Sequence, residues 1–153
     1  MNVGDKIPAV LGVDQNGKEI KAADFAGKKL VLYAYPKDNT SGCTAEACSL
    51  RDHKEELAAK GYSILGVSKD SAASHQKFID KQALNFDLIA DTETNLLQAL
   101  GAWGEKKLYG KTSMGTLRTT YLVDETGTIT HIFTPKQIKT KEHAEQILQV
   151  IGE

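Results

Sequence analysis

The segment that decides the fold reads Tyr35-Pro36-Lys37-Asp38-Asn39-Thr40-Ser41-Gly42-Cys43-Thr44-Ala45-Glu46-Ala47-Cys48. It follows a hydrophobic run, passes through a polar loop and continues into a helix-like pattern. It also holds the only two cysteines of the 153-residue chain. A thiol in the first turn of a helix faces unpaired backbone N–H groups and the positive end of the helix dipole, which favour the thiolate. Cys43 is therefore the candidate nucleophile.

Outward from this segment, hydrophobic runs rich in β-branched and aromatic residues predict strands at 29–35, 62–67, 119–123 and 129–133. Helical patterns predict helices at 44–60, 71–82, 95–100 and 141–151, and Gly61 is suited to end the first of them. This alternation predicts βαβ units and parallel strands in the central sheet of an α/β fold, with the sheet covered on both faces and flanked by helices.

Turn signals complete the predicted topology. Asn16-Gly17 predicts an N-terminal β-hairpin, and Glu125-Thr126-Gly127 predicts an antiparallel connection between the last two strands, which makes the central sheet mixed. The stretch 101–116 contains four glycines and few aliphatic residues, and we expect a long irregular loop there. Long irregular loops are often functional.

Composition limits the classes of function. A chain of 153 residues with 41% hydrophobic and 25% charged residues can bury a core, and we expect one domain spanning residues 1–153. The net charge of −1 gives no general attraction to nucleic acid or to an anionic membrane. The first residues lack an apolar signal region, and no stretch approaches the roughly 18 apolar residues of a membrane span. We therefore expect a cytoplasmic protein without nucleic-acid or membrane partners.

Arg51 and Arg118 are the only arginines among 19 basic residues. Arginine offers a rigid fork of donors that lysine cannot reproduce, so each position suggests a specific contact. The competing interpretation is that both are ordinary surface charges.

The spacing of the two cysteines favours a transient bond. In an α-helix, residues five apart have Cα atoms roughly 8.6 Å apart. A disulfide requires less than about 7 Å. Cys43 and Cys48 therefore cannot bond within an intact helix, but local unwinding brings them within reach. In a chain of this kind, two cysteines are more often catalytic or redox-sensing than a structural bridge.

Three competing interpretations of the cysteines remain open from the residues alone. Cys43, Cys48 and His53 are zinc-ligand types, but their spacing spreads them around a helix and disfavours a metal site. A thiol oxidoreductase would use the same strand-loop-helix position, with a spacing of two residues rather than four. Cys48 could also be a small buried hydrophobe. The simplest interpretation of the four histidines is that each is solvated or partly packed: His53, His75, His131 and His143.

The pattern Pro36-x-x-x-Thr40-x-x-Cys43 resembles the active-site signature of the peroxiredoxins. The wider match is similar to the bacterioferritin-comigratory-protein (PrxQ) branch and covers essentially the whole chain. It comprises residues 35–40, Gly42-Cys43-Thr44, Glu46-Ala47-Cys48, Arg51-Asp52, Trp103-Gly104-Glu105-Lys106, Gly110-Lys111 and residues 118–124. Ser41 departs from the branch, which often has proline there; this loosens the loop but removes no reacting group.

The resemblance implies a thioredoxin-like fold and a thiol peroxidase that uses no cofactor. It implies that Cys43 attacks hydrogen peroxide or an organic hydroperoxide, and that Cys48 resolves the sulfenic acid as a disulfide. It further implies reduction by thioredoxin or a similar dithiol protein, and a monomer or weak homodimer.

The resemblance also places three residues in the peroxide pocket. Pro36 would shield the sulfur and Thr40 would offer a hydroxyl to peroxide or thiolate, whereas Arg118 would donate to both sulfur and oxygen. From the residues alone, an ordinary strand terminator, a helix N-cap and a surface charge remain open for these positions. Glu46 and Arg51 would either brace the site or, more simply, be solvated helix charges. Trp103 is expected to be a packing residue or loop anchor, and Tyr35 a core residue.

Two further function classes are carried as alternatives. A thiol-disulfide oxidoreductase would share the fold without consuming peroxide. A non-enzymatic redox sensor or holdase would oxidise at Cys43 but turn over poorly with any reductant.

Overall fold

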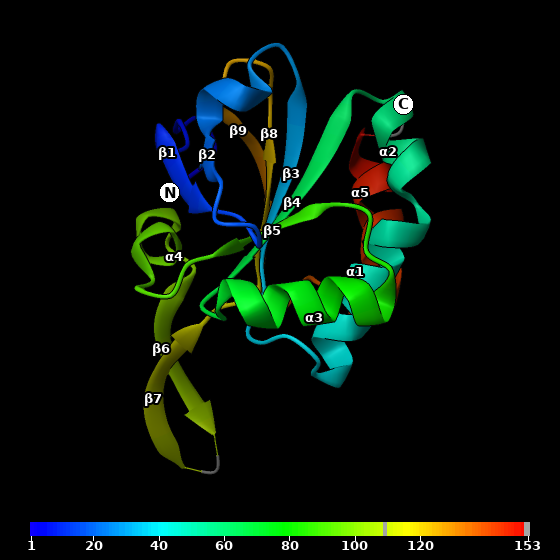
Figure 1. Cartoon of the computed structure of the whole chain (residues 1–153). Helices are drawn as coiled ribbons and strands as arrows, with labels where there is room; N and C mark the ends of the chain where they lie inside the picture. Colours follow the sequence, from blue (N-terminus) through cyan, green and yellow to red (C-terminus); the bar gives the residue numbers. More distant parts are fainter. Residues whose placement is uncertain (109, 152–153) are drawn as a thin grey trace.

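The computed structural model describes residues 1–108 and 110–151 and centres on a five-stranded sheet of order β5-β4-β3-β8-β9 (Figure 1). The strands are β3 (Lys29–Ala34), β4 (Tyr62–Ser68), β5 (Asp87–Ala90), β8 (Thr119–Val123) and β9 (Ile129–Phe133). Strand β4 runs parallel to β3 and to β5, whereas β8 runs antiparallel to β3 and to β9. The expected mixed sheet is confirmed; β5 was not predicted.

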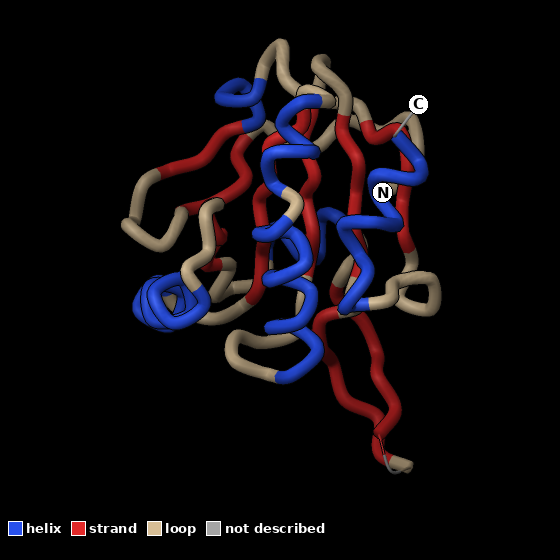
Figure 2. The backbone as a smooth tube through the Cα atoms, turned by 90° about the vertical axis from the view of Figure 1, so that its right-hand side faces the viewer, coloured by secondary structure: helices blue, strands red, loops and turns tan. Residues whose placement is uncertain are grey.

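Helices cover one face of this sheet, and a hairpin with a short helix covers the other (Figures 1 and 2). The first group is α1 (Ser41–Asp52), α2 (Lys54–Ala59), α3 (Ala72–Gln82) and α5 (His143–Ile151), the last preceded by the 3-10 turn Thr140–Glu142. The second is β1 (Val10–Val13), β2 (Glu19–Lys21), the 3-10 turn Ala22–Phe25 and α4 (Asn95–Leu100). The predicted N-terminal hairpin is confirmed. In the part of the chain that the structure describes, every helix is too short or too polar to cross a membrane.

The prediction of a single helix at 44–60 is wrong, because the helix is interrupted at His53. The amide of His53 donates to the carbonyl of Leu50, and the imidazole Nδ1 lies 2.8 Å from the carbonyl oxygen of Ser49. In a continuous helix, the amide of His53 would donate to the carbonyl of Ser49. The imidazole ring binds that carbonyl instead, and such an insertion of a side chain ends or kinks a helix. Helix α1, which carries both cysteines, is therefore a separate twelve-residue unit.

Alternating side chains of β3 supply two hydrophobic cores, one on each face of the sheet. Leu30 and Leu32 point into the core beneath the hairpin and α4, whereas Val31 and Tyr33 point into the core beneath α1, α3 and α5. This alternation is the period of two expected for a strand. Cys43 belongs to the second core, so the reactive segment is packed against the sheet. Tyr35 is buried, as predicted.

Most of the stretch 101–116 forms two paired strands, and the prediction of an irregular loop is wrong. Strands β6 (Trp103–Leu108) and β7 (Lys111–Thr116) pair antiparallel as a separate two-stranded sheet and extend away from the body (Figure 1). Backbone pairing stabilises it rather than burial of a hydrophobic face, so its sequence lacks the alternation that marks a half-buried strand. Trp103, at its base, packs against the core, as expected.

We predict that Gly66→Ala lowers the free energy of unfolding by about 1–3 kcal/mol, as overpacking in a tight core does. A Cβ atom at Gly66 would lie 2.7 Å from Leu88 Cδ2 and 2.9 Å from Tyr33 Cε1, and both side chains are fully buried. Chemical denaturation measures the change. Ser63→Ala, in the same strand at a half-buried position, is the control; equal effects of the two substitutions would contradict the prediction.

Candidate active site

Cys43 is the third residue of α1, and its side chain is 1% exposed. The first helical hydrogen bond runs from the amide of Thr44 to the carbonyl of Thr40. The amides of Gly42 and Cys43 therefore precede the helical ladder at the positive end of the helix, and neither has a hydrogen-bond partner among the described residues. The predicted position of the thiol, in the first turn of a helix that follows a buried strand, is confirmed.

The guanidinium of Arg118 contacts the thiol from the connection between β7 and β8. Its Nη2 lies 3.3 Å from Cys43 Sγ, and its Nη1 donates to Glu46 Oε1 at 2.6 Å. Gly42 permits this approach, because a Cβ atom there would lie 3.3 Å from Arg118 Nη2. Arg118 is thus half-buried in the site, and the surface-charge interpretation is wrong.

Glu46 is fully buried, so the prediction of a solvated helix charge is wrong. Burial raises the pKa of its carboxyl, and the charge and hydrogen bond of Arg118 offset this only in part, which leaves the pKa at about 7. Its Oε2 accepts no hydrogen bond within the described part of the chain. Glu46 lies three residues after Cys43, and this spacing puts both on one helix face. That spacing was the available signal in the sequence.

His143 lies beside the carboxyl oxygen of Glu46 that Arg118 does not contact. The prediction that His143 is solvated or partly packed is also wrong. Its ring is fully buried, with Nε2 2.7 Å from Thr120 Oγ1 and 3.8 Å from Glu46 Oε2. Its Nδ1 lies 3.0 Å from Gln146 Oε1. Burial lowers the pKa of His143 to about 4, so the ring is neutral near pH 7. Among these groups, Arg118 is therefore the cation that faces Glu46.

Thr40 and Pro36 lie in the loop that leads into α1. Thr40 is the N-cap residue by backbone geometry, but its hydroxyl does not cap the helix and donates instead to the carbonyl of Lys37 at 2.9 Å. The lone pairs of this hydroxyl remain available as acceptors. Pro36 directly follows the buried Tyr35 and is half-buried itself. Both residues precede Cys43 on the same short loop, but the hydroxyl of Thr40 does not donate to the sulfur in this structure.

Cys48 lies one and a half turns further along α1 and is half-buried. Its thiol points toward α3, where Sγ lies 3.7 Å from Gln82 Oε1. Both thiols are free in this structure. Arg51, one turn further along, bonds Asp52 and the backbone carbonyl of Gln82 rather than Cys43 or Glu46. The two arginines thus differ: one contacts the thiol, and the other ties α1 to the end of α3.

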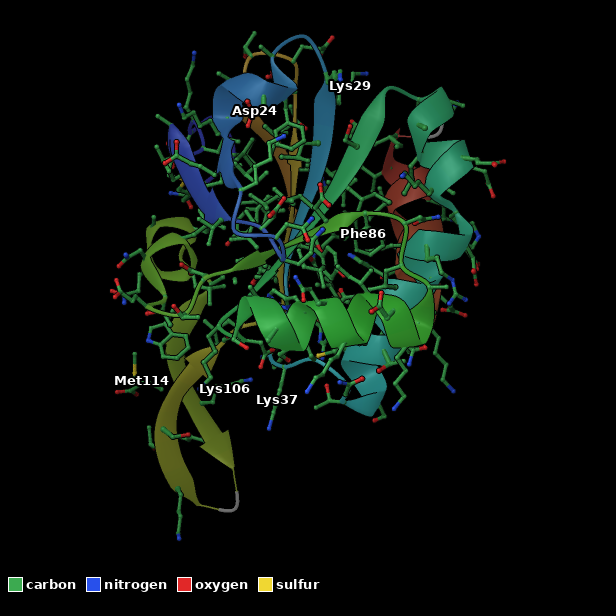
Figure 3. The ribbon with its side chains drawn as sticks, in the orientation of Figure 1. Asp24, Lys29, Lys37, Phe86, Lys106 and Met114 are labelled. Atoms are coloured by element: carbon green, nitrogen blue, oxygen red, sulfur yellow. The ribbon has the colours of Figure 1, made fainter. Side chains whose placement is uncertain are left out.

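Strand β6 of the hairpin carries a further basic residue, Lys106. Lys106 is half-buried on β6, and its pKa is lowered by burial and by the charge of Arg118, with Cys43 acting in the opposite direction. In Figure 3, Lys106 extends from the hairpin and Lys37 from the loop before α1. Lys106 on the hairpin is therefore electrostatically coupled to Arg118 and Cys43.

One group of potential metal ligands occurs in the described ranges: Asp38, Asp70 and His75, whose ligand atoms lie within 4.8 Å of one another. Both oxygens of Asp38 and both ring nitrogens of His75 already have hydrogen-bonding partners. The arrangement is therefore a hydrogen-bond network rather than an open coordination shell. His75 is fully buried, which corrects the prediction that it is solvated or partly packed.

Comparisons with known proteins agree with this geometry. A family model described as the AhpC/TSA family matches residues 3–132. The putative peroxiredoxin bcp of Haemophilus influenzae is 40% identical over 151 residues, which cover 99% of this chain and 96% of that relative. Peroxiredoxin Bcp of Escherichia coli is 37% identical over 153 residues, with coverages of 100% and 97%. A solved structure of the bacterioferritin comigratory protein of Xanthomonas campestris has a TM-score of 0.88 at 32% identity and covers 99% of this chain and 98% of its own.

The fold, the buried thiol and the similar proteins all indicate the same class of protein. This class consists of thioredoxin-fold enzymes that reduce peroxides with a cysteine thiol. Within that class the chain belongs to the AhpC/TSA family of peroxiredoxins, in the bacterioferritin-comigratory-protein (PrxQ) branch. It is a thiol-dependent peroxidase, and its turnover requires a peroxide and a thiol reductant.

We predict that Glu46 makes stability depend on pH. Its pKa is about 7 in the folded protein against 4.5 for the unperturbed group, so the folded state binds this proton more tightly. The contribution of this proton to the free energy of unfolding is complete below about pH 4.5 and is lost as the pH rises through 7. Between about pH 4.5 and pH 8, the stability of the wild type relative to Glu46→Gln should fall by about 3 kcal/mol. Urea unfolding of both proteins at several pH values measures this difference, and a constant difference would contradict the assignment.

Proposed function

We propose that Cys43 is the peroxidatic nucleophile and that Cys48 is the thiol that resolves its oxidised form. The observation that supports this most directly is the contact of Arg118 Nη2 with Cys43 Sγ at 3.3 Å, on a guanidinium that Glu46 holds from its other side. A fixed cation beside the sulfur stabilises the thiolate and directs a donor toward the oxygen on which charge develops.

In the first step, the Cys43 thiolate attacks the terminal oxygen of the hydroperoxide. An S–O bond forms and the O–O bond breaks, which yields Cys43 sulfenic acid and an alkoxide or hydroxide that leaves as alcohol or water after protonation. Arg118 and the free amides at the start of α1 are the donors for the departing oxygen, and Thr40 offers a hydroxyl to the peroxide. Pro36, which has no N–H, shields the sulfur from water.

In the second step, the Cys48 thiol condenses with the sulfenic acid, which releases water and forms the Cys43–Cys48 disulfide. Both residues lie in α1, at a Cα separation of roughly 8.6 Å in regular helix, so the start of α1 must unwind first. Cys48 lies on the outer side of α1 toward Gln82, where its thiol is not locked into the core. An external dithiol then reduces the disulfide by thiol-disulfide exchange.

The reductant in this proposal is thioredoxin or a similar dithiol protein, and the substrates are hydrogen peroxide and organic hydroperoxides. The bacterioferritin comigratory protein of Xanthomonas campestris has alkyl peroxide reduction activity, which supports the organic substrates. We propose that the chain acts in the cytoplasm as one domain of residues 1–153, as a monomer or weak homodimer.

The two cysteine variants test this assignment. Cys43→Ser should abolish peroxidase activity, because a serine hydroxyl is not ionised near neutral pH. Cys48→Ser should consume one equivalent of peroxide at the wild-type rate and then stop, leaving a sulfenic acid that dimedone traps. Stopped-flow peroxide consumption and mass spectrometry give both results. Wild-type turnover by Cys43→Ser, or loss of the first turnover in Cys48→Ser, would contradict the respective role.

The arginines provide a matched pair of conservative substitutions. Arg118→Lys should slow the reaction of Cys43 with peroxide by at least about tenfold, because one ammonium cannot contact Glu46 and the sulfur with the geometry of the guanidinium. Arg51→Lys, on the same helix as Cys43 but directed to Gln82, should change the rate less than about threefold. Equal effects of the two substitutions on the second-order rate constant would remove the special role of Arg118.

A further inference from the structure

The loop 36–40 carries Pro36 and Thr40, and its middle residue, Asp38, is directed into the protein. The carboxylate of Asp38 is almost fully buried. Its Oδ1 accepts from Tyr35 Oη at 2.6 Å, and its Oδ2 accepts from Ser74 Oγ at 2.8 Å. The same Oδ2 lies 2.7 Å from Nδ1 of His75 on α3. The loop is therefore anchored to α3 by an acidic side chain that the reaction itself does not use.

The partners of His75 fix where its hydrogens lie. Nε2 is 2.9 Å from the carbonyl oxygen of Ile89, which can only accept, so Nε2 carries a hydrogen. Burial raises the pKa of Asp38, but hydrogen bonds from His75 and Tyr35 outweigh it and leave the pKa below its usual value. Asp38 is therefore ionised near pH 7, and the hydrogen between Asp38 and His75 lies on Nδ1. The two residues are therefore joined by a buried hydrogen bond between Nδ1 and the carboxylate.

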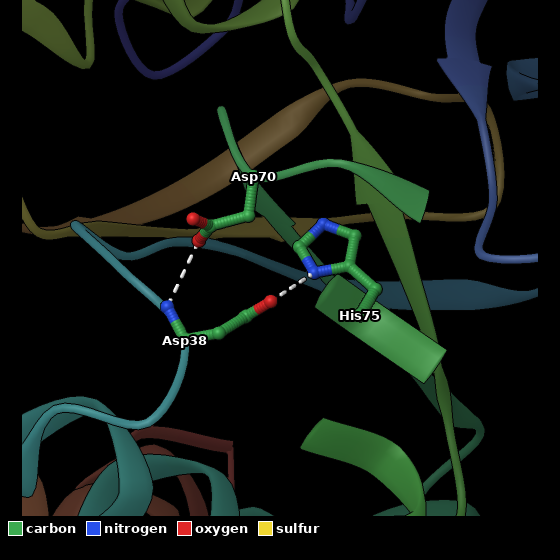
Figure 4. A group of neighbouring side chains, drawn as sticks. All are labelled: Asp38, Asp70 and His75. Atoms are coloured by element: carbon green, nitrogen blue, oxygen red, sulfur yellow. Dashed lines mark hydrogen bonds and ion pairs between the residues drawn. The ribbon is translucent and has the colours of Figure 1, made fainter. Parts of the chain in front are cut away.

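A second contact holds the backbone of the same loop. The amide of Asp38 donates to Asp70 Oδ2 at 2.8 Å (Figure 4). Ser68 Oγ donates to the same Oδ2 at 2.7 Å. Asp38 is thus held through its main chain by the end of β4 and through its side chain by α3. The next residue, Asn39, has a left-handed backbone with φ of 63°, and α1 begins two residues later.

We propose that Asp38 and His75 are positioning residues for the peroxidase reaction, and that their buried pair fixes Thr40 and the start of α1 when Cys43 meets peroxide. The pair also anchors the chain just before the segment that unwinds to form the disulfide. Asn39 connects the anchored loop to that segment. This inference rests on the proposed roles of Cys43 and Thr40, and it adds residues that touch neither the sulfur nor the peroxide.

The first test separates positioning from the intrinsic reactivity of the thiol. Reduced Asp38→Asn and His75→Asn are each reacted with hydrogen peroxide and with iodoacetamide. Alkylation needs only an accessible thiolate, whereas peroxide cleavage also needs the aligned pocket. The ratio of the peroxide rate constant to the alkylation rate constant should fall at least about tenfold in both variants. An unchanged ratio would overturn the proposal.

Asp14→Asn is the matched control. Asp14 is also a buried aspartate, but it accepts from the amides of Asn16 and Lys18 in the N-terminal hairpin. This substitution should leave the ratio at the wild-type value. An equal fall in Asp14→Asn would show that the ratio reports general loosening of the protein, and the proposal would fail.

A second test measures amide exchange on the wild-type protein, so it does not depend on the folding of a variant. The Asp38 amide should exchange slowly with solvent in the reduced protein and equally slowly in the disulfide form, because its bond to Asp70 lies outside the unwinding segment. Faster exchange at Asp38 after oxidation would overturn its role as the anchor before that segment. The proposed function fails on a separate result, wild-type turnover by Cys43→Ser, so the two can be told apart.

Discussion

The contact on which the site depends is the guanidinium of Arg118, shared between the thiol of Cys43 and the carboxylate of Glu46. A fully buried carboxyl is costly to ionise without a partner, and a buried ion pair broken on one side is strongly destabilising. Arg118 therefore holds α1 against the connection between β7 and β8, and in the proposed mechanism it also polarises the sulfur. The same side chain would then serve both the packing of α1 and the reaction of the thiol, and Gly42 leaves room for it.

The proposed mechanism requires this region to be rigid in its first step and mobile in its second. The loop before Asn39 is held by Asp38, Asp70 and His75, which suits a reaction that needs aligned atoms. The start of α1 must then unwind, which breaks a few backbone hydrogen bonds worth about 1 kcal/mol net each. The break at His53 separates α1 from α2. Unwinding of α1 therefore need not extend into α2.

Much of the fold could be predicted from the sequence, because continuous apolar runs mark buried strands and helical periodicity marks the helices. The hairpin of β6 and β7 could not, since its polar strands are stabilised by pairing with each other. The four-residue β5 was missed as well. Its first residue, Asp87, is exposed, whereas the next two residues, Leu88 and Ile89, are fully buried.

The sequence predicts the residues that are proposed to react, but it does not predict the buried charges around them. Cys43 and Arg118 follow from residue chemistry and from the family motif. The burial of Glu46 depends on an arginine 72 residues away, and that of Asp38 on a histidine 37 residues away. A carboxylate or an imidazole on a helix is usually solvated, so local sequence favours the wrong prediction whenever the partner lies far along the chain.

Formation of the disulfide through unwinding of α1 is tested most directly by amide hydrogen exchange on the reduced protein and on the oxidised protein, with the Cys43–Cys48 bond confirmed by mass spectrometry. We expect faster exchange across residues 44–50 after oxidation and unchanged exchange in α4, on the opposite face of the sheet. Identical exchange across residues 44–50 in the two states would contradict the unwinding of α1.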